Sequence, residues 1–153
     1  MTDIPLCGIK KFTEIHHLKH RDRRTWMDKN EFSQIRYGLG KTQNQLAQLL
    51  GTSPKAIQSF EQGWRKIPVH TERQLLFLLT LKRSKGEGRR PCWVMQNCPT
   101  KIRQNCPAWE FQTGDLCWFI NGTICQGEVQ ESWQKKMKIC RRCEVFRLVL
   151  LPL

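Results

Sequence analysis

Long apolar runs are missing from this sequence, and histidine is missing from its second half. No apolar run approaches the roughly 20 residues of a membrane-spanning helix. Residues 1–11 also lack the apolar core of a secretory signal. These absences predict a cytoplasmic protein without a membrane partner. All four histidines precede residue 91, so a metal site in the second half would use sulfur alone.

Acidic residues are scarce, with 13 Asp and Glu against 26 Lys and Arg. Residues 1–90 carry 18 basic and 8 acidic residues, whereas residues 91–153 carry 8 and 5. Basic side chains that neutralise phosphates release counterions, so the first half favours a polyanionic partner. Seven of the eight cysteines lie after residue 91. This opposite distribution predicts two small domains of different chemistry.

Composition divides the chain into five segments. They are a basic arm at 1–27, a helical domain at 28–83, a linker at 84–91, a cysteine-rich module at 92–147 and an apolar tail at 148–153. The linker is rich in glycine and polar residues and has no apolar residue. The apolar tail is predicted to form a strand or an extended segment that covers the core. The alternative is a peptide that docks on a partner.

The basic arm has apolar residues at three-residue intervals, Phe12, Ile15 and Leu18, among many cationic ones. This spacing predicts an amphipathic helix. Packing on the next domain is the favoured role, and contact with a nucleic-acid backbone is the alternative.

Capping residues predict two short helices in the second segment. Asp28 precedes an apolar stripe that ends near Gly40, and Thr42 with Gln45 forms a capping box for the next helix. Gly51 stands where that second helix would end in a left-handed residue.

A third helix follows almost immediately. Ser53 can cap it and Pro54 suits its first turn, while Ile57 and Phe60 recur at helical spacing before Gly63. Two short helices joined by a tight glycine turn form a helix-turn-helix unit.

These residues resemble the Cro and lambda-repressor-like (Xre-type) helix-turn-helix family. The resemblance covers about a third of the chain and rests on spaced residues: Thr42, Gln43, Leu46, Ala47, Leu50, Gly51, Ser53, Ile57, Glu61 and Gly63. It implies binding of double-stranded DNA through the third helix, and often a homodimer on a palindromic site.

By this resemblance, six residues are expected to contact DNA. Gln43 would touch phosphate or a base edge, three residues of the third helix would read bases, and two would hold the flanking backbone. The reading residues are Lys55, Gln58 and Ser59, and the flanking ones are Arg65 and Lys66. Ala47, Ile57 and Phe60 are expected to pack between helices, and core packing is also the favoured role of Trp64.

The sequence departs from the family pattern at three positions. Pro54 stands where a polar reader is common, Lys41 replaces a usually apolar residue, and Pro68 comes one residue late. A further helix, capped by Thr71 or a neighbour, would contain more leucine than one buried stripe needs. Part of its surface is therefore expected to meet another element or a second subunit.

The cysteine-rich module predicts a hairpin and a helix. Asn121 and Gly122 lie between apolar runs, which favours a hairpin over residues 117–125 with Cys117 and Cys125 on opposite faces. Residues 132–143 predict a helix with Trp133, Met137 and Cys140 on one side. The predicted fold class is thus mainly α, a helix-turn-helix bundle of about five helices plus a small α+β module.

Clustered cysteines in a reducing cytoplasm favour metal ligation or redox chemistry over a disulfide framework. A four-thiolate site would draw on Cys140, Cys143 and two others, and either zinc or an iron–sulfur cluster suits sulfur ligands. The candidate metal ligands are Cys92, Cys98, Cys106, Cys117, Cys125, Cys140 and Cys143. The Cys-Trp doublets at 92–93 and 117–118 resemble the two-CW cysteine-rich modules, a resemblance that implies a module boundary but no chemistry.

Two functions fit these patterns. The first is a transcriptional regulator whose cysteine module senses metal or redox state or docks a protein partner. The second is an antitoxin-like repressor or interaction protein whose module is only a zinc-stapled binding domain. An enzyme is not expected, because Cys140 and Cys143 lack the strand and helix pattern of a thioredoxin-like site.

Overall fold

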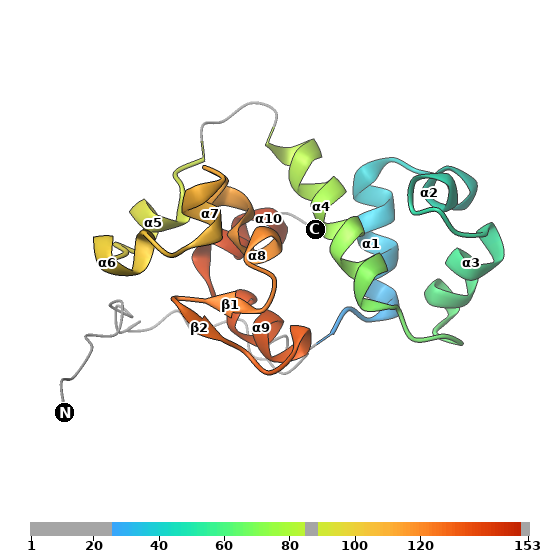
Figure 1. Cartoon of the computed structure of the whole chain (residues 1–153). Coiled ribbons are helices and arrows are strands. Elements are labelled where there is room, and N and C mark those ends of the chain that lie inside the picture. The colour runs from blue at the N-terminus through green and yellow to red at the C-terminus, as the bar shows by residue number, and fades with distance from the viewer. Residues whose placement is uncertain (1–25, 85–88, 151–153) are drawn as a thin grey trace, which may run out of the picture. The chain divides into compact units, whose positions relative to one another are not determined.

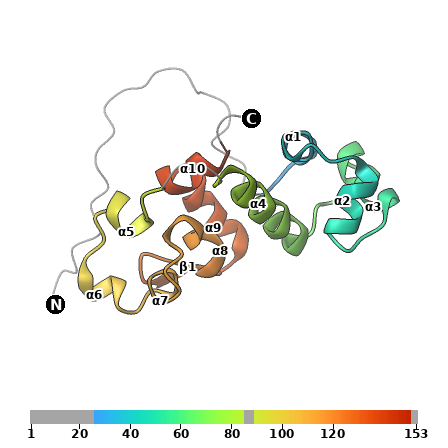
Figure 2. The ribbon, with the colours of Figure 1, turned by 90° about the horizontal axis from the view of Figure 1, so that it is seen from above.

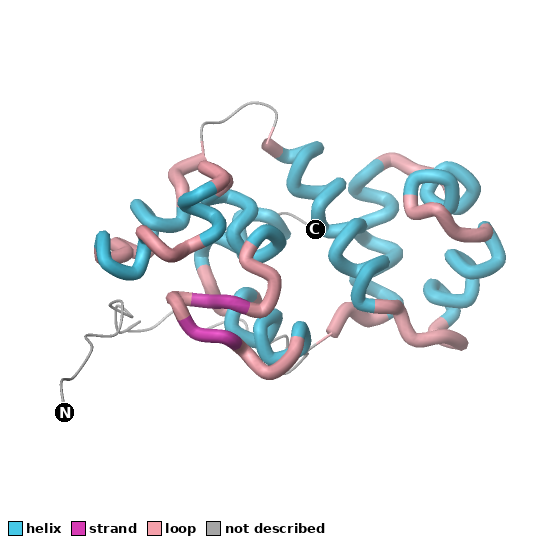
Figure 3. Tube along the Cα trace, in the orientation of Figure 1, coloured by secondary structure: helices cyan, strands magenta, loops and turns pink. Residues whose placement is uncertain are grey.

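The computed structural model describes residues 26–84 and 89–150. The predicted helix of the basic arm lies outside the described residues. The chain forms two compact units, one mainly of residues 26–88 and the other mainly of residues 89–148. Both are helical apart from one small antiparallel hairpin, which confirms the predicted mainly α class (Figure 3). Within the described ranges, no helix has the length and apolar character needed to cross a membrane.

The first unit contains four helices within residues 26–84. They are α1 (Lys29–Leu39), α2 (Gln43–Leu49), α3 (Pro54–Gln62) and α4 (Val69–Arg83). Helices α2 and α3 pack on each other, and α1 packs on α3 and α4 (Figures 1 and 2). The expected bundle of about five helices counted the basic arm, which is not described.

Local capping chemistry sets the helix boundaries as predicted. Asp28, Thr42 and Ser53 each accept a hydrogen bond from the backbone N–H three residues on. The Gln45 side chain returns a bond to the Thr42 backbone N–H at 3.0 Å, which completes the capping box. Gly40, which follows α1, has a φ of 68°. This left-handed conformation is one that residues other than glycine rarely adopt.

The core of this unit joins one face of each helix. The rings of Phe32 and Phe60 meet edge to face at 5.7 Å between centroids. Fully buried residues with them include Ile35, Leu46, Ile57, Leu75, Leu76 and Leu79. The predicted packing roles of Ala47, Ile57 and Phe60 are confirmed, because all three are buried.

Helix α4 begins differently from the prediction. Pro68 is its N-terminal cap residue and offers no side-chain hydrogen bond, whereas Thr71 lies within the helix and is buried. A proline can start a helix because its missing N–H would have no partner in the first turn. The expected excess of apolar surface is present, since Leu81 is 44% exposed.

The second unit is built from very short elements. Its helical segments are α5 (Cys92–Met95), α6 (Thr100–Arg103), α7 (Pro107–Glu110), η1 (Gly114–Leu116), α8 (Cys117–Ile120), α9 (Trp133–Cys140) and α10 (Glu144–Leu150). Pro91, Pro99 and Pro107 stand at the starts of α5, α6 and α7. Each proline fixes the backbone where a helical turn begins, so these turns need little length.

The hairpin lies later in the chain than predicted. Residues 117–120 form the helical turn α8, and the strands are β1 (Ile124–Cys125) and β2 (Glu128–Val129). Gln126 and Gly127 form the two-residue turn, both with positive φ, as a type I′ turn requires. Asn-Gly after α8 ends a helical turn instead, a role for which a left-handed glycine is equally suited. The predicted opposite faces of Cys117 and Cys125 therefore have no basis.

The end of the second unit also differs from the prediction. Helix α9 is capped by Ser132 as the pattern suggests and buries Trp133, but it ends at Cys140 rather than Cys143. Residues 148–150, predicted as a strand or extended tail, belong to helix α10. Trp118 and Phe146 form the centre of this core, with ring centroids 5.5 Å apart.

Candidate nucleic-acid interface and cysteine cluster

Helix α3 presents two of the predicted base-reading residues to solvent. Lys55 and Gln58 are exposed, whereas Ala56, Ile57 and Phe60 are buried on its other side. Ser59 is half-buried, and its hydroxyl donates to the Lys55 carbonyl at 2.9 Å. Its proton is therefore used within the helix, so Ser59 can offer a ligand only an acceptor in this conformation.

A hydrogen-bonded clamp joins α1, α2 and α3 beside this surface. Glu61 accepts from Arg36 Nε at 2.6 Å and from Gln43 Nε2 at 2.6 Å. Arg36 Nη1 donates to the Lys41 carbonyl at 2.9 Å, just before α2. The clamp fixes Gln43 at the first position of α2 and leaves the second N–H of its amide for another acceptor.

In the clamp, hydrogen bonds and charge pairing together shift the pKa values of Glu61 and Arg36 more than burial does. Burial alone would raise the pKa of Glu61, but the hydrogen bonds from Arg36 and Gln43 hold that pKa below its usual value. Burial would likewise lower the pKa of Arg36, and its bond to Glu61 raises that pKa instead. Sequence reasoning counted Glu61 only as part of the family pattern. The sequence feature that could have indicated this clamp is Arg36, an arginine directly after Ile35 in the predicted apolar stripe of the first helix. Both residues are buried.

The segment after α3 is exposed and cationic. Arg65 and Lys66 are exposed, as a role on the flanking backbone requires, and Lys66 Nζ lies 5.2 Å from the centre of the Trp26 ring. Trp64 is 75% exposed. Its predicted core packing is therefore wrong, because the left-handed Gly63 ends α3 and carries the chain away from the core.

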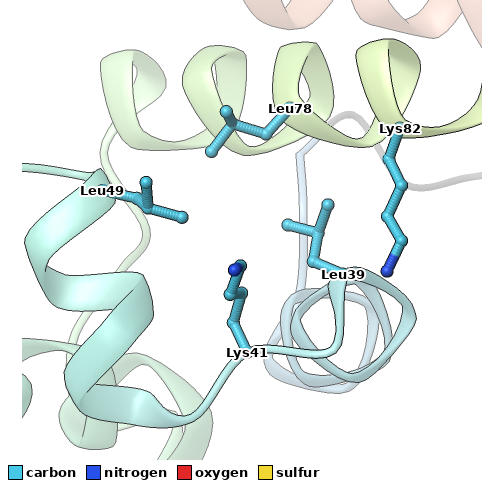
Figure 4. Close-up of a pocket in the computed structure, with 5 residues that line it drawn as sticks. All are labelled: Leu39, Lys41, Leu49, Leu78 and Lys82. Atoms are coloured by element: carbon cyan, nitrogen blue, oxygen red, sulfur yellow. The ribbon is translucent and has the colours of Figure 1, made fainter.

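An open hollow of about 290 Å³ lies among α1, α2 and α4 of the first unit. Leu39, Leu49 and Leu78 supply its apolar lining, and Lys41 reaches into it (Figure 4). A lysine is tolerated at Lys41 because it is half-buried and lines an open hollow, so its alkyl stem can lie beside the leucines while its ammonium stays in water. None of the predicted DNA-contact residues lines the hollow.

The second unit brings six of its seven cysteines near one another. Charge interactions link Cys117 to Cys92, Cys140 and Cys143, and they link Cys125 to Cys92, Cys106 and Cys143. Cys140 and Cys143 were predicted to belong to one group, and both are among these six.

Cys106 and Cys98 also have neighbours that are not cysteines. Cys106 accepts a hydrogen bond from Asn121 Nδ2 at 3.3 Å, and Asn121 Oδ1 accepts from the Ala108 backbone N–H at 2.8 Å. The Cys98 thiol lies 3.9 Å from the Pro99 carbonyl. The side chain of Asn121 thereby ties α7 to the end of α8.

The group is not arranged around one point. Among residues 26–84 and 89–150, no three Cys, His, Asp or Glu side chains are grouped closely enough to hold a metal ion. Zinc or an iron–sulfur cluster at these cysteines stays a prediction. Sulfur ligands suit both, so the donor type fits even though the described arrangement does not converge.

Burial and pairing give these thiols different acidities. Burial raises the pKa of Cys140 to about 12 and also raises those of Cys125 and Cys143. The Cys92 and Cys117 thiols act on each other more strongly than any other group acts on either of them. This interaction lowers the pKa of Cys92 and raises the pKa of Cys117, so Cys92 is the readier thiolate.

Lys136 is a buried cation beside the cysteines. It is 1% exposed, and its ammonium donates to the Gly122 carbonyl at 3.2 Å and to the Ile124 carbonyl. Its charge acts on Cys125 and Cys140, where it opposes the effect of burial. A buried ammonium favours negative charge on neighbouring sulfur.

Comparison of the chain with family models, curated proteins and solved structures found no match. The helix-turn-helix and two-CW likenesses therefore rest on the residues quoted above.

Proposed function

We propose that the chain is a sequence-specific regulator of transcription that binds double-stranded DNA through α3. The observation that carries the proposal is the exposure of Lys55 and Gln58 on a short helix whose opposite side is buried. A tight turn with left-handed Gly51 separates α3 from α2. This arrangement is the one by which a second helix enters a major groove.

The proposed contacts follow from donor geometry. Lys55 would donate to guanine O6 and N7, and the Gln58 amide can pair with adenine N6 and N7. Gln43 would give its second amide N–H to a phosphate, while Arg65 and Lys66 would neutralise flanking phosphates. Exposed Trp64 would lie against the sugar and phosphate chain next to these cations.

The clamp at Glu61 supports this proposal because it fixes the angle of the helices before DNA arrives. Arg36 and Glu61 have side chains only 9% exposed, and their bonds join α1 to α3. A rigid unit loses less freedom on binding than a mobile one, so more of the contact energy remains as affinity.

We further propose that the cysteine-rich unit makes binding responsive to redox state or to a metal. Support comes from five neighbouring cysteines with thiols of unlike acidity. Whether the second unit responds to redox state or to a metal, the proposed partner of the first unit is DNA.

The test is selection of bound duplexes from a random pool, followed by titration of the selected site. Lys55→Ala and Gln58→Ala are each expected to cost about 1–3 kcal/mol on that site and to relax preference at one base position. Lys82→Ala, an exposed lysine of α4, is the matched control and should leave preference unchanged. Unaltered selectivity in both α3 variants would refute the assignment.

A further inference from the structure

We infer that Cys92 and Cys117 form a reversible disulfide, which makes this pair the redox-responsive site of the second unit. The inference deepens the redox part of the proposed function and rests on it. It starts from position, because Cys92 is the first residue of α5 and Cys117 is the first residue of α8, and these two turns are held together by the packing described next. Each thiol is also the group that acts most strongly on the acidity of the other.

Packing around Gly114 holds the two turns together. A Cβ built at Gly114 would lie 2.4 Å from Pro91 Cβ and 2.8 Å from Trp93 Cζ3. The backbone three residues before Cys117 therefore lies close against Pro91 and the Trp93 ring, the neighbours of Cys92 in the sequence. Such close approach is possible only because residue 114 has no side chain.

A second contact fixes α5 from another direction. The rings of Trp93 and Trp109 meet edge to face with centroids 4.9 Å apart, and Trp109 belongs to α7. Helix α7 in turn packs on α8. The two turns that carry Cys92 and Cys117 are thus part of a closed set of contacts.

Two paired thiols suit a covalent bond between sulfurs. A structural metal site requires about four converging donors, and the pair supplies two. A disulfide requires the sulfurs to approach to about 2.05 Å with suitably placed Cβ atoms.

The chemistry balances with a peroxide as oxidant. One thiolate attacks a peroxide oxygen, the O–O bond breaks, and a sulfenic acid and one water are formed. The second thiol then attacks the sulfenic sulfur and displaces a second water. Two thiols and hydrogen peroxide therefore give one disulfide and two waters, and a cytoplasmic dithiol reverses the step by exchange.

The experiment uses the full chain, purified reduced and treated with one equivalent of hydrogen peroxide. Remaining thiols are blocked, and the digest is mapped by mass spectrometry before and after dithiothreitol. The expected result is one dominant dithiothreitol-sensitive peptide pair that joins Cys92 to Cys117. Cys92→Ser and Cys117→Ser should each lose it, whereas Cys98→Ser, the matched control, should retain it.

Other results would overturn the inference. These are a dominant bond between Cys140 and Cys143, no cross-link at all, or stoichiometric zinc that shields both thiols from peroxide. The wild-type peptide map stays decisive if a serine variant fails to fold, which circular dichroism would show.

DNA titration of the reduced and oxidised wild-type chain separates this inference from the proposed function. DNA binding without the cross-link defeats only the inference. A cross-link in a chain that binds no DNA in either state defeats the proposed function and leaves the disulfide standing.

Discussion

Glu61 accepts hydrogen bonds from side chains of two other helices, and so couples local chemistry to the packing of the first unit. The Arg36 and Gln43 donors arrive from α1 and α2. A carboxylate held this way is more stable in its charged form than it is in an unfolded chain. Folding of this unit should therefore depend on pH through this one group.

Glu61→Gln is expected to destabilise the first unit by about 1–3 kcal/mol at pH 7, because Arg36 loses its charged partner in a largely buried place. The pKa of Glu61 is lower folded than its usual 4.5. Its stabilisation is therefore complete above about pH 4.5 and is lost as pH falls through the folded pKa. Melting temperatures measured between about pH 3 and about pH 7 should fall less steeply on acidification in the variant.

Glu131→Gln is the control for that prediction. Glu131 pairs with Lys135 one helical turn away, and both side chains are largely exposed. Exposed pairs contribute about 0–1 kcal/mol, so melting at neutral pH should hardly move. Equal effects from the two variants would mean that the clamp adds nothing beyond a surface pair.

Element boundaries were predictable wherever they depend on neighbouring residues. Asp28, Thr42 and Ser53 start helices by bonds to backbone three residues away, so the sequence contains all the information needed. The turn at Gln126 escaped prediction because a non-glycine residue occupies a positive φ there. Asn121 and Gly122 suit both a hairpin and a helix end, and only tertiary packing decides between them.

The four-residue helices of the second unit were beyond sequence reasoning for a related cause. One turn of helix shows no periodicity, so α5 to α8 have no recognisable pattern. The approach of the turns that carry Cys92 and Cys117 depends on the contact between Pro91 and Gly114, which lie far apart in the sequence. The exposed residues of α3 were predictable from family spacing, whereas the bond that engages Ser59 was not.

Gly114→Ala tests whether that contact shapes the second unit. The new methyl would clash with Pro91 Cβ and backbone Cα, at 2.4 and 2.8 Å, so α5 and η1 must separate. Overpacking of this kind costs about 1–3 kcal/mol. Chemical unfolding followed by tryptophan fluorescence should show the destabilisation, and peroxide should give less of the Cys92 to Cys117 cross-link.

Lys101→Ala is the companion to Gly114→Ala. Lys101 is exposed in α6, and its removal should change neither stability nor cross-linking. A stable Gly114→Ala chain with full cross-linking would show that the two turns meet without this close approach.

Charge is divided unequally over the whole molecule, with 18 basic and 8 acidic residues in 1–90 against 8 and 5 in 91–153. If the first unit alone meets phosphate, only its cations should set the salt dependence of DNA binding. Removing a cation that neutralises one phosphate reduces the slope of log affinity against log salt by about 1. The slope therefore reports how many phosphates the protein neutralises, which affinity at one salt concentration does not.

Arg65→Ala combined with Lys66→Ala should lower that slope by about 2 and weaken binding to all duplexes alike. Lys101→Ala combined with Lys138→Ala removes two exposed cations from the second unit and should leave the slope unchanged. Fluorescence anisotropy over a series of salt concentrations measures both. If both double variants lowered the slope equally, the cysteine-rich unit would also neutralise phosphates. Every cation that releases a counterion on binding contributes to the salt dependence.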